Sequence, residues 1–153
     1  MPVDASVDLS SVLAGLDRLS GVSESLARSM AVAAGQVVRD EAKARAPVDT
    51  GKLRDALYLA YSDRRSREST VVYSVTWNSK KAPHGHLLEF GHWQVVGGKR
   101  GKGGVEVGFT PARPFLRPAY EAVAPRMAQI MVERGRERLQ ELLRGAAGDV
   151  ESD

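Results

Sequence analysis

The triplet Asp49-Thr50-Gly51 is the first group of residues in this chain that could do chemistry. Aspartic proteases bring two Asp-Thr-Gly loops together so that two carboxylates share one proton. This chain has a single copy, and the triplet follows a charged segment, residues 39–47, instead of an apolar strand. The pattern therefore favours a turn, in which Asp49 or Thr50 caps a helical turn beginning near Lys52 and Gly51 supplies backbone freedom.

A second group could hold a metal ion, because three imidazoles lie near one carboxylate in the sequence. The group consists of His84, His86, Glu89 and His92. A zinc site needs three or four ligands that converge on one point, and this spacing matches no strong zinc motif. The pattern favours surface or partly buried histidines, so we expect no metal ion and no other cofactor.

The third group is a glycine-rich basic loop, residues 97–104, with the cations Lys99, Arg100 and Lys102. A nucleotide-binding P-loop needs four residues between its first glycine and a Gly-Lys pair, and then serine or threonine. Here Gly97 precedes the Gly-Lys pair by one residue too few, and another glycine follows the lysine. We expect a flexible hairpin tip that could contact an acidic partner or a phosphate backbone.

The composition excludes several classes of protein. The 153 residues include no cysteine, which removes disulfide scaffolds, iron–sulfur and zinc–cysteine sites, and cysteine nucleophiles. No apolar run approaches the ~18–20 residues of a membrane span, and residues 1–10 lack a signal-peptide pattern, so we expect a soluble, unexported protein without membrane contact. The length fits one domain, residues 1–148, followed by an acidic disordered tail, residues 149–153.

The elements that could position these three groups of residues begin with helices in the first third of the chain. Apolar residues recur there at spacings of three and four, which predicts two helices at about 8–20 and 23–45. We expect Ser20-Gly21 to separate them. Pro47 should end the second helix, because the residue before a proline is pushed out of the helical region.

The middle of the chain, about 57–110, is expected to form the sheet region, because β-branched and aromatic residues replace the helical period. The expected strands are 57–61, 70–77, 93–96 and 105–107, with a single helical turn at 86–90.

A long helix is expected at about 117–144. Pro118 suits its first turn, whereas Pro125 removes a backbone donor and should kink or restart the helix. The apolar positions are interrupted by the charged run 134–138, which should be solvated or ion-paired. No Ser-His-Asp order and no paired catalytic carboxylates stand out, so nothing in the sequence requires an enzyme.

Three segments together carry a family resemblance: 46–54 (APVDTGKLR), 86–92 (HLLEFGH) and 112–119 (ARPFLRPA). Their order resembles that of the tail-completion or head–tail joining (neck) proteins of long-tailed, lambdoid-type bacteriophages. The resemblance covers roughly residues 25–145. In the middle segment, His92 stands where the family usually has threonine.

The resemblance implies an α+β fold in which a small antiparallel β-sheet packs against an N-terminal helix and a long C-terminal helix. It implies a noncatalytic structural protein of the virion, assembled in the host cytoplasm. Such proteins form a homo-oligomeric ring, hexameric in the virion, at the head-proximal end of the tail. The implied partners are further copies of the chain, the tail terminator, and head-closure or adaptor proteins.

The motif residues are the candidates for assembly contacts: Asp49, Thr50, Gly51, Leu53, Glu89, Phe90, Gly91, Arg113, Pro114, Phe115, Leu116 and Arg117. Within 113–118, the prolines restrict the backbone, which lowers the ordering entropy that docking would cost. This segment could therefore anchor the final helix or a neighbouring subunit, or Phe115 and Leu116 could simply fill the core of their own domain.

The segment around Glu89 favours a role in folding. We expect Phe90 to enter the core and Gly91 to end the helical turn. Glu89 is expected to pair with a cation such as Arg54 or Arg113.

A small basic nucleic-acid-binding protein is the alternative function. It would use Lys99, Arg100, Lys102, Arg113 and Arg117, which lie close together in the sequence. Phosphate contacts of this kind would make the affinity fall steeply with salt. The net charge of +3 is low for a dedicated nucleic-acid binder, so DNA contact stays an open possibility.

Overall fold

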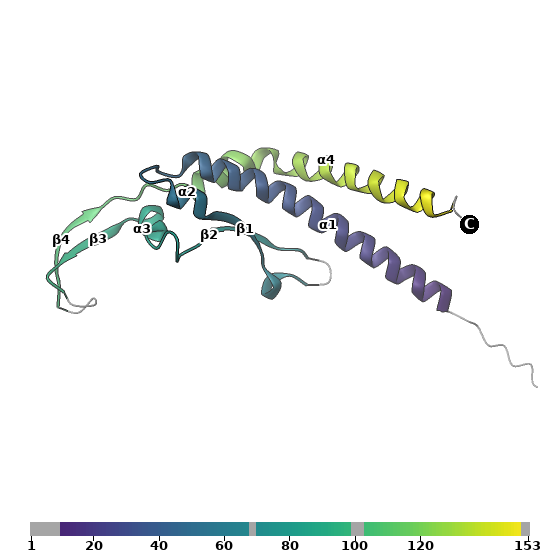
Figure 1. Ribbon diagram of the computed structural model, residues 1–153, viewed down its shortest axis with the longest axis horizontal. Coiled ribbons are helices and arrows are strands. Elements are labelled where there is room, and N and C mark those ends of the chain that lie inside the picture. Colours follow the sequence, from purple (N-terminus) through teal and green to yellow (C-terminus); the bar gives the residue numbers. More distant parts are fainter. Residues whose placement is uncertain (1–9, 68–69, 99–102, 151–153) are drawn as a thin grey trace, which may run out of the picture.

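The structure, a computed structural model, describes residues 10–67, 70–98 and 103–150. Two long helices, α1 (Ser10–Arg45) and α4 (Leu116–Val150), lie side by side and run antiparallel (Figure 1). The elements between them are α2 (Lys52–Ala56), β1 (Leu57–Tyr61), η1 (Asp63–Arg65), β2 (Tyr73–Trp77), α3 (Gly85–Phe90), β3 (His92–Val96) and β4 (Val105–Thr110). The expected α+β class is confirmed, although the strands form two separate two-stranded sheets.

Helix α1 is continuous, so the expected break at Ser20-Gly21 is wrong. Glycine costs about 1 kcal/mol in a helix interior, which lowers helix stability without ending the helix. Contacts on the C-terminal side of Gly21 compensate for this loss of helix stability, because Ser25 and Ser29 of α1 accept hydrogen bonds from arginines of α4. The helix ends at Arg45, two residues before Pro47, as expected.

The first sheet lies against α1. Strands β1 and β2 pair antiparallel from Leu57↔Trp77 to Tyr61↔Tyr73. Gly35 of α1 leaves room for Leu59, because a Cβ atom at position 35 would stand 2.5 Å from Leu59 Cδ1. β2 begins three residues later than expected, and its predecessors 71–72 are half-buried without being part of the strand.

Strands β3 and β4 form the second sheet, a hairpin that we call the arm. The arm projects away from the two long helices (Figure 1). Its strands pair antiparallel, with a register shift between Gln94 and Val95. β4 extends to Thr110, three residues beyond its expected end, and the tip residues 99–102 lie outside the described residues.

Helix α4 continues through Pro125, so of the two expected outcomes a restart at this residue is wrong, and a kink stays a prediction. The helix also extends to Val150, past the expected end at 144, and Asp149 is therefore helical where a disordered tail was expected. Residues 151–153 of that tail lie outside the described residues. No helix in the described part of the chain is long and apolar enough to cross a membrane.

The charged run of α4 is ion-paired, as expected. Arg134 Nη1 lies 3.1 Å from both Glu137 and Glu141, and Arg138 Nη1 lies 2.8 Å from Glu141. The hydrogen bonds from Arg138, and then from Arg134, lower the pKa of Glu141. The same network raises the pKa of Arg134, mainly through its hydrogen bond to Glu137. These arginines also reach serines of α1, so the network ties the two long helices together.

The continuity of α1 predicts opposite effects for two glycine substitutions. Gly21→Ala should raise the free energy of unfolding by about 0.5–1 kcal/mol, because alanine favours a helix interior and its Cβ would meet nothing within 4 Å. Gly35→Ala gains the same propensity but presses against Leu59, so we expect a lower net stability. Urea denaturation followed by circular dichroism measures both. A destabilised Gly21→Ala variant would indicate a helix break at that position.

Candidate functional site

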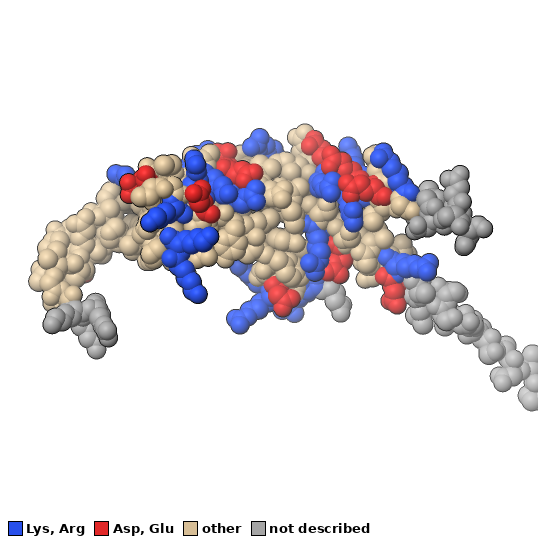
Figure 2. Space-filling view, viewed as in Figure 1, with Lys and Arg blue, Asp and Glu red and all other residues tan. Residues whose placement is uncertain are grey.

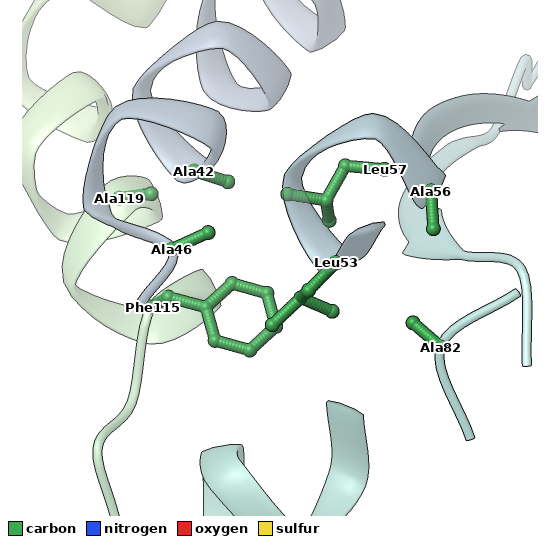
Figure 3. Packing of buried hydrophobic residues seen from close by; sticks show 8 residues of the cluster. All are labelled: Ala42, Ala46, Leu53, Ala56, Leu57, Ala82, Phe115 and Ala119. Atoms are coloured by element: carbon green, nitrogen blue, oxygen red, sulfur yellow. The ribbon is translucent and has the colours of Figure 1, made fainter. Parts of the chain in front are cut away.

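The three motif segments meet at Phe115, whose side chain is completely buried (Figure 3). The buried cluster around it consists of Ala42, Ala46, Leu53, Ala56, Leu57, Ala82, Phe115 and Ala119. Trp77 meets the Phe115 ring edge-on, with ring centroids 6.1 Å apart. Leu88 and Leu116 pack against the same cluster. Leu53, Phe115 and Leu116 therefore belong to the protein's own core.

The carboxylate of Glu89 binds the beginning of α4. It accepts hydrogen bonds from the backbone N–H groups of Phe115 (2.8 Å), Leu116 (3.1 Å) and Arg117 (3.2 Å). An α-helix leaves its first four N–H groups without partners inside the helix. The fourth position here is Pro118, which has no N–H, so all of these donors are accounted for.

Helix α3 is held so that Glu89 reaches α4. The carbonyl of Leu88 accepts a hydrogen bond of 2.7 Å from the N–H of Arg113, immediately before α4. Gly91 ends α3 with φ +75°, as expected, and a Cβ there would lie 2.8 Å from the carbonyl oxygen of Thr110. A glycine is therefore required both by the backbone conformation and by the close approach of β4.

Two expectations for α3 are wrong. Glu89 uses its carboxylate on backbone N–H groups, where we expected an ion pair with Arg54 or Arg113. Phe90 is 70% exposed instead of buried, and Leu88 packs against the core in its place. Residues two apart in a helix lie on different sides, because each residue turns the chain by about 100°.

The expected caps of α2 are also wrong. Within this fully described stretch, no side chain caps α2, and Asp49 and Thr50 are exposed. The first turn closes through the backbone instead, since the carbonyl of Gly51 accepts a 3.0 Å hydrogen bond from Asp55. Gly51 does supply backbone freedom, with φ +77°. The Asp-Thr-Gly triplet thus forms a helix-entry turn.

We call the contact of Glu89 and the Phe115 cluster with the start of α4 the junction. Arg113, Pro114 and Arg117 are exposed beside it. Lys99, Arg100 and Lys102 lie outside the described residues, so the predicted grouping of these cations with Arg113 and Arg117 stays a prediction. In Figure 2, positive and negative side chains alternate along the body, and the described strands of the arm are mostly uncharged on the face shown.

The histidines do not gather into a metal site within the described ranges, where no group of three potential His, Asp or Glu ligands occurs. His84 and His86 are exposed, whereas His92 begins β3 and is half-buried. The Nδ1 atom of His92 is buried and has no hydrogen-bond partner among the described residues.

The arm carries an apolar surface that we did not predict. Its members and exposed fractions are Trp93 (57%), Val95 (52%), Val96 (62%), Val105 (68%), Val107 (59%) and Phe109 (53%). The rings of Trp93 and Phe109 pack across the strands with centroids 5.3 Å apart. The sequence signal was the run of β-branched and aromatic residues on both sides of the basic loop, which we interpreted only as strands.

The body carries an apolar groove between the first sheet, α1 and α4, with a volume of about 420 Å³. Gly35 and Leu59 lie in it, and Tyr120 and Met127 of α4 line it. None of its lining residues is charged. Such a groove suits an apolar occupant.

The comparison with protein families decides the assignment. Residues 10–91 match the family described as "Bacteriophage HK97-gp10, putative tail-component". The chain belongs to this family. Comparisons with curated proteins and with solved structures gave no significant match. The expected kinship with phage tail and neck proteins is thereby confirmed at the level of a phage tail component that assembles with other virion proteins.

The HK97-gp10-like match spans α1, the first sheet and α3, and it ends at Gly91. It includes Glu89 and the turn at Gly51, whereas the arm and α4 follow it. The matched region thus contains Glu89, whereas the backbone N–H groups that its carboxylate binds, at 115–117, lie C-terminal to the matched region.

The hydrogen bonds at the start of α4 predict that removing the Glu89 carboxylate destabilises the protein strongly. Glu89→Ala should lower the free energy of unfolding by about 2–4 kcal/mol, because it leaves the N–H groups at the start of α4 without acceptors. Glu89→Gln should cost less, about 1–2 kcal/mol, because one side-chain oxygen and no charge remain.

Urea denaturation measures both Glu89 variants, and Glu106→Ala on the exposed face of β4 is the matched control. The control should change stability by less than about 0.5 kcal/mol. Equal stabilities of Glu89→Ala and Glu106→Ala would contradict the capping role.

Proposed function

We propose that this protein is a structural component of the phage neck. It forms or joins a homo-oligomeric ring, a hexamer, at the head-proximal end of the tail, and it is needed for tail completion and head–tail joining. Its partners are further copies of itself, the tail terminator, and head-closure or adaptor proteins. It acts in the virion, by shape and docking, without catalysis.

The apolar surface of the arm, in a member of a tail-component family, is the observation that carries this proposal. An isolated two-stranded hairpin is at best marginally stable in water. Larger apolar patches on a soluble protein mark interaction sites. The arm is therefore a surface that assembly would cover.

The junction at Phe115 supports the same role. The base of the arm is fixed to the body at Gly91 and, through the Arg113–Leu88 hydrogen bond, just before α4. A surface presented on a fixed base loses less entropy when it docks. The buried and half-buried motif residues thus support assembly by orienting the arm, whereas the exposed ones, among them Phe90 and Arg117, could take part in contacts directly.

Removal of the gene from a phage should leave filled heads and separate tails that fail to join, because the proposed ring completes the end of the tail. Electron microscopy of lysates measures this outcome, with the wild-type gene supplied from a plasmid as the control. Normal joined virions in the deletion strain would contradict the proposal.

The purified protein should form a particle with the mass of a ring, alone or after addition of the tail terminator. Multi-angle light scattering at several concentrations measures the mass, and duplex DNA titrated at low salt tests the nucleic-acid alternative. Salt-sensitive DNA binding without a ring under any condition would favour that alternative.

A further inference from the structure

The arm leaves a substantial apolar area uncovered. Its two half-exposed aromatic rings and four valines together present on the order of 500 Å² to solvent. Successive residues of a strand point to opposite faces, so these side chains are divided between the two faces of the arm, and Val95 and Val96 lie on different faces. The face that carries Trp93 and Phe109 therefore offers a smaller area than the ~800 Å² that one partner contributes to a standard interface, so its two rings need a pocket that encloses them. Among the described residues, β3 and β4 contact mainly each other.

The groove on the body offers a complementary surface. A cavity of about 150 Å³ lined by aliphatic side chains binds benzene. The groove, at about 420 Å³, therefore has room for an indole and a phenyl ring. Its floor is made of small residues of α1, including Ala34 and Gly35, and its walls come from Val75 and Met131.

We propose that the arm of one subunit inserts its Trp93 and Phe109 rings into this groove on a second copy of the chain. The residues that line the groove are all uncharged, which favours aromatic rings over a charged peptide or a phosphate backbone as the occupant. The inference rests on the proposed ring and names the contact that builds it.

The geometry of this contact fits a ring. The arm and the groove are different surfaces, so their contact is heterologous, and repeated heterologous contacts close into a ring when the rotation allows it. The arm projects from the body, away from the long helices that help form the groove (Figure 1). Each subunit therefore gives one arm and receives one.

The absence of cysteine from the chain makes a direct test possible. Val107→Cys places a thiol on the arm, and Tyr120→Cys places one at the 55% exposed rim of the groove. Leu143→Cys is the matched control, because it is 62% exposed on the same helix and does not line the groove. Each variant carries one thiol, so a cross-link can form only between copies.

The full-length variants are mixed in pairs, assembled with the tail terminator, and treated with a short bis-maleimide. Denaturing gels should show a cross-linked dimer for the arm and groove pair, and loss of that band for the arm and control pair. The double variant Trp93→Ser with Phe109→Ser should lose ring formation while the helical circular dichroism signal and the melting of the body stay those of the wild type, because α1, α4 and the Phe115 cluster lie outside the arm.

Two results would overturn the inference and can be told apart. Rings visible by electron microscopy without the arm–groove cross-link, or with the arm cross-linked to the terminator, would leave the neck function intact and reject this contact. Wild-type protein that never forms a ring would reject both.

Discussion

The contact between the Glu89 carboxylate and the first N–H groups of α4 is the constraint on which the arrangement of this protein depends. It joins residues separated by 26–28 positions in the sequence. On one side of it, Phe115 enters the core; on the other, Gly91 turns the chain into the arm. The start of α4, the core and the base of the arm are therefore fixed by one carboxylate, which also offers negative charge to the positive end of a helix dipole.

Periodicity and proline positions predicted four strands, the turn at α3 and the end of α1, because they carry that information locally, whereas the α+β class was implied by the family resemblance. The role of Glu89 could not be predicted, since backbone N–H groups exist at every residue and leave no mark in the sequence. The continuity of α1 through Gly21 depends on packing against α4, which outweighs local propensity. Phe90 was misplaced because residue type alone does not show how a short helix is rotated, and this rotation buries Leu88, two residues earlier, instead.

The candidate site divides into residues that hold the fold and residues that remain available for contact. Leu53, Glu89 and Phe115 were predicted as candidate assembly residues, and the contacts that the structure shows for them lie within the same chain. The surface left uncovered, around Trp93 and Phe109, lies outside the three motifs. Membership of a phage tail-component family supplies the context in which assembly would cover such an arm.

Because Glu89 binds backbone N–H groups at the start of α4, this contact restricts few of the substitutions that relatives of this protein could carry there. The side chains of Leu116 and Arg117 do not take part in the hydrogen bonds to Glu89, so these positions are free to diverge as far as the cap is concerned. A proline at 115, 116 or 117 would delete a donor. The two prolines of this segment stand at 114 and 118, immediately outside the three required N–H groups. With respect to this cap, relatives should therefore vary widely in side-chain type at 116 and 117, but they should not carry proline at 115, 116 or 117.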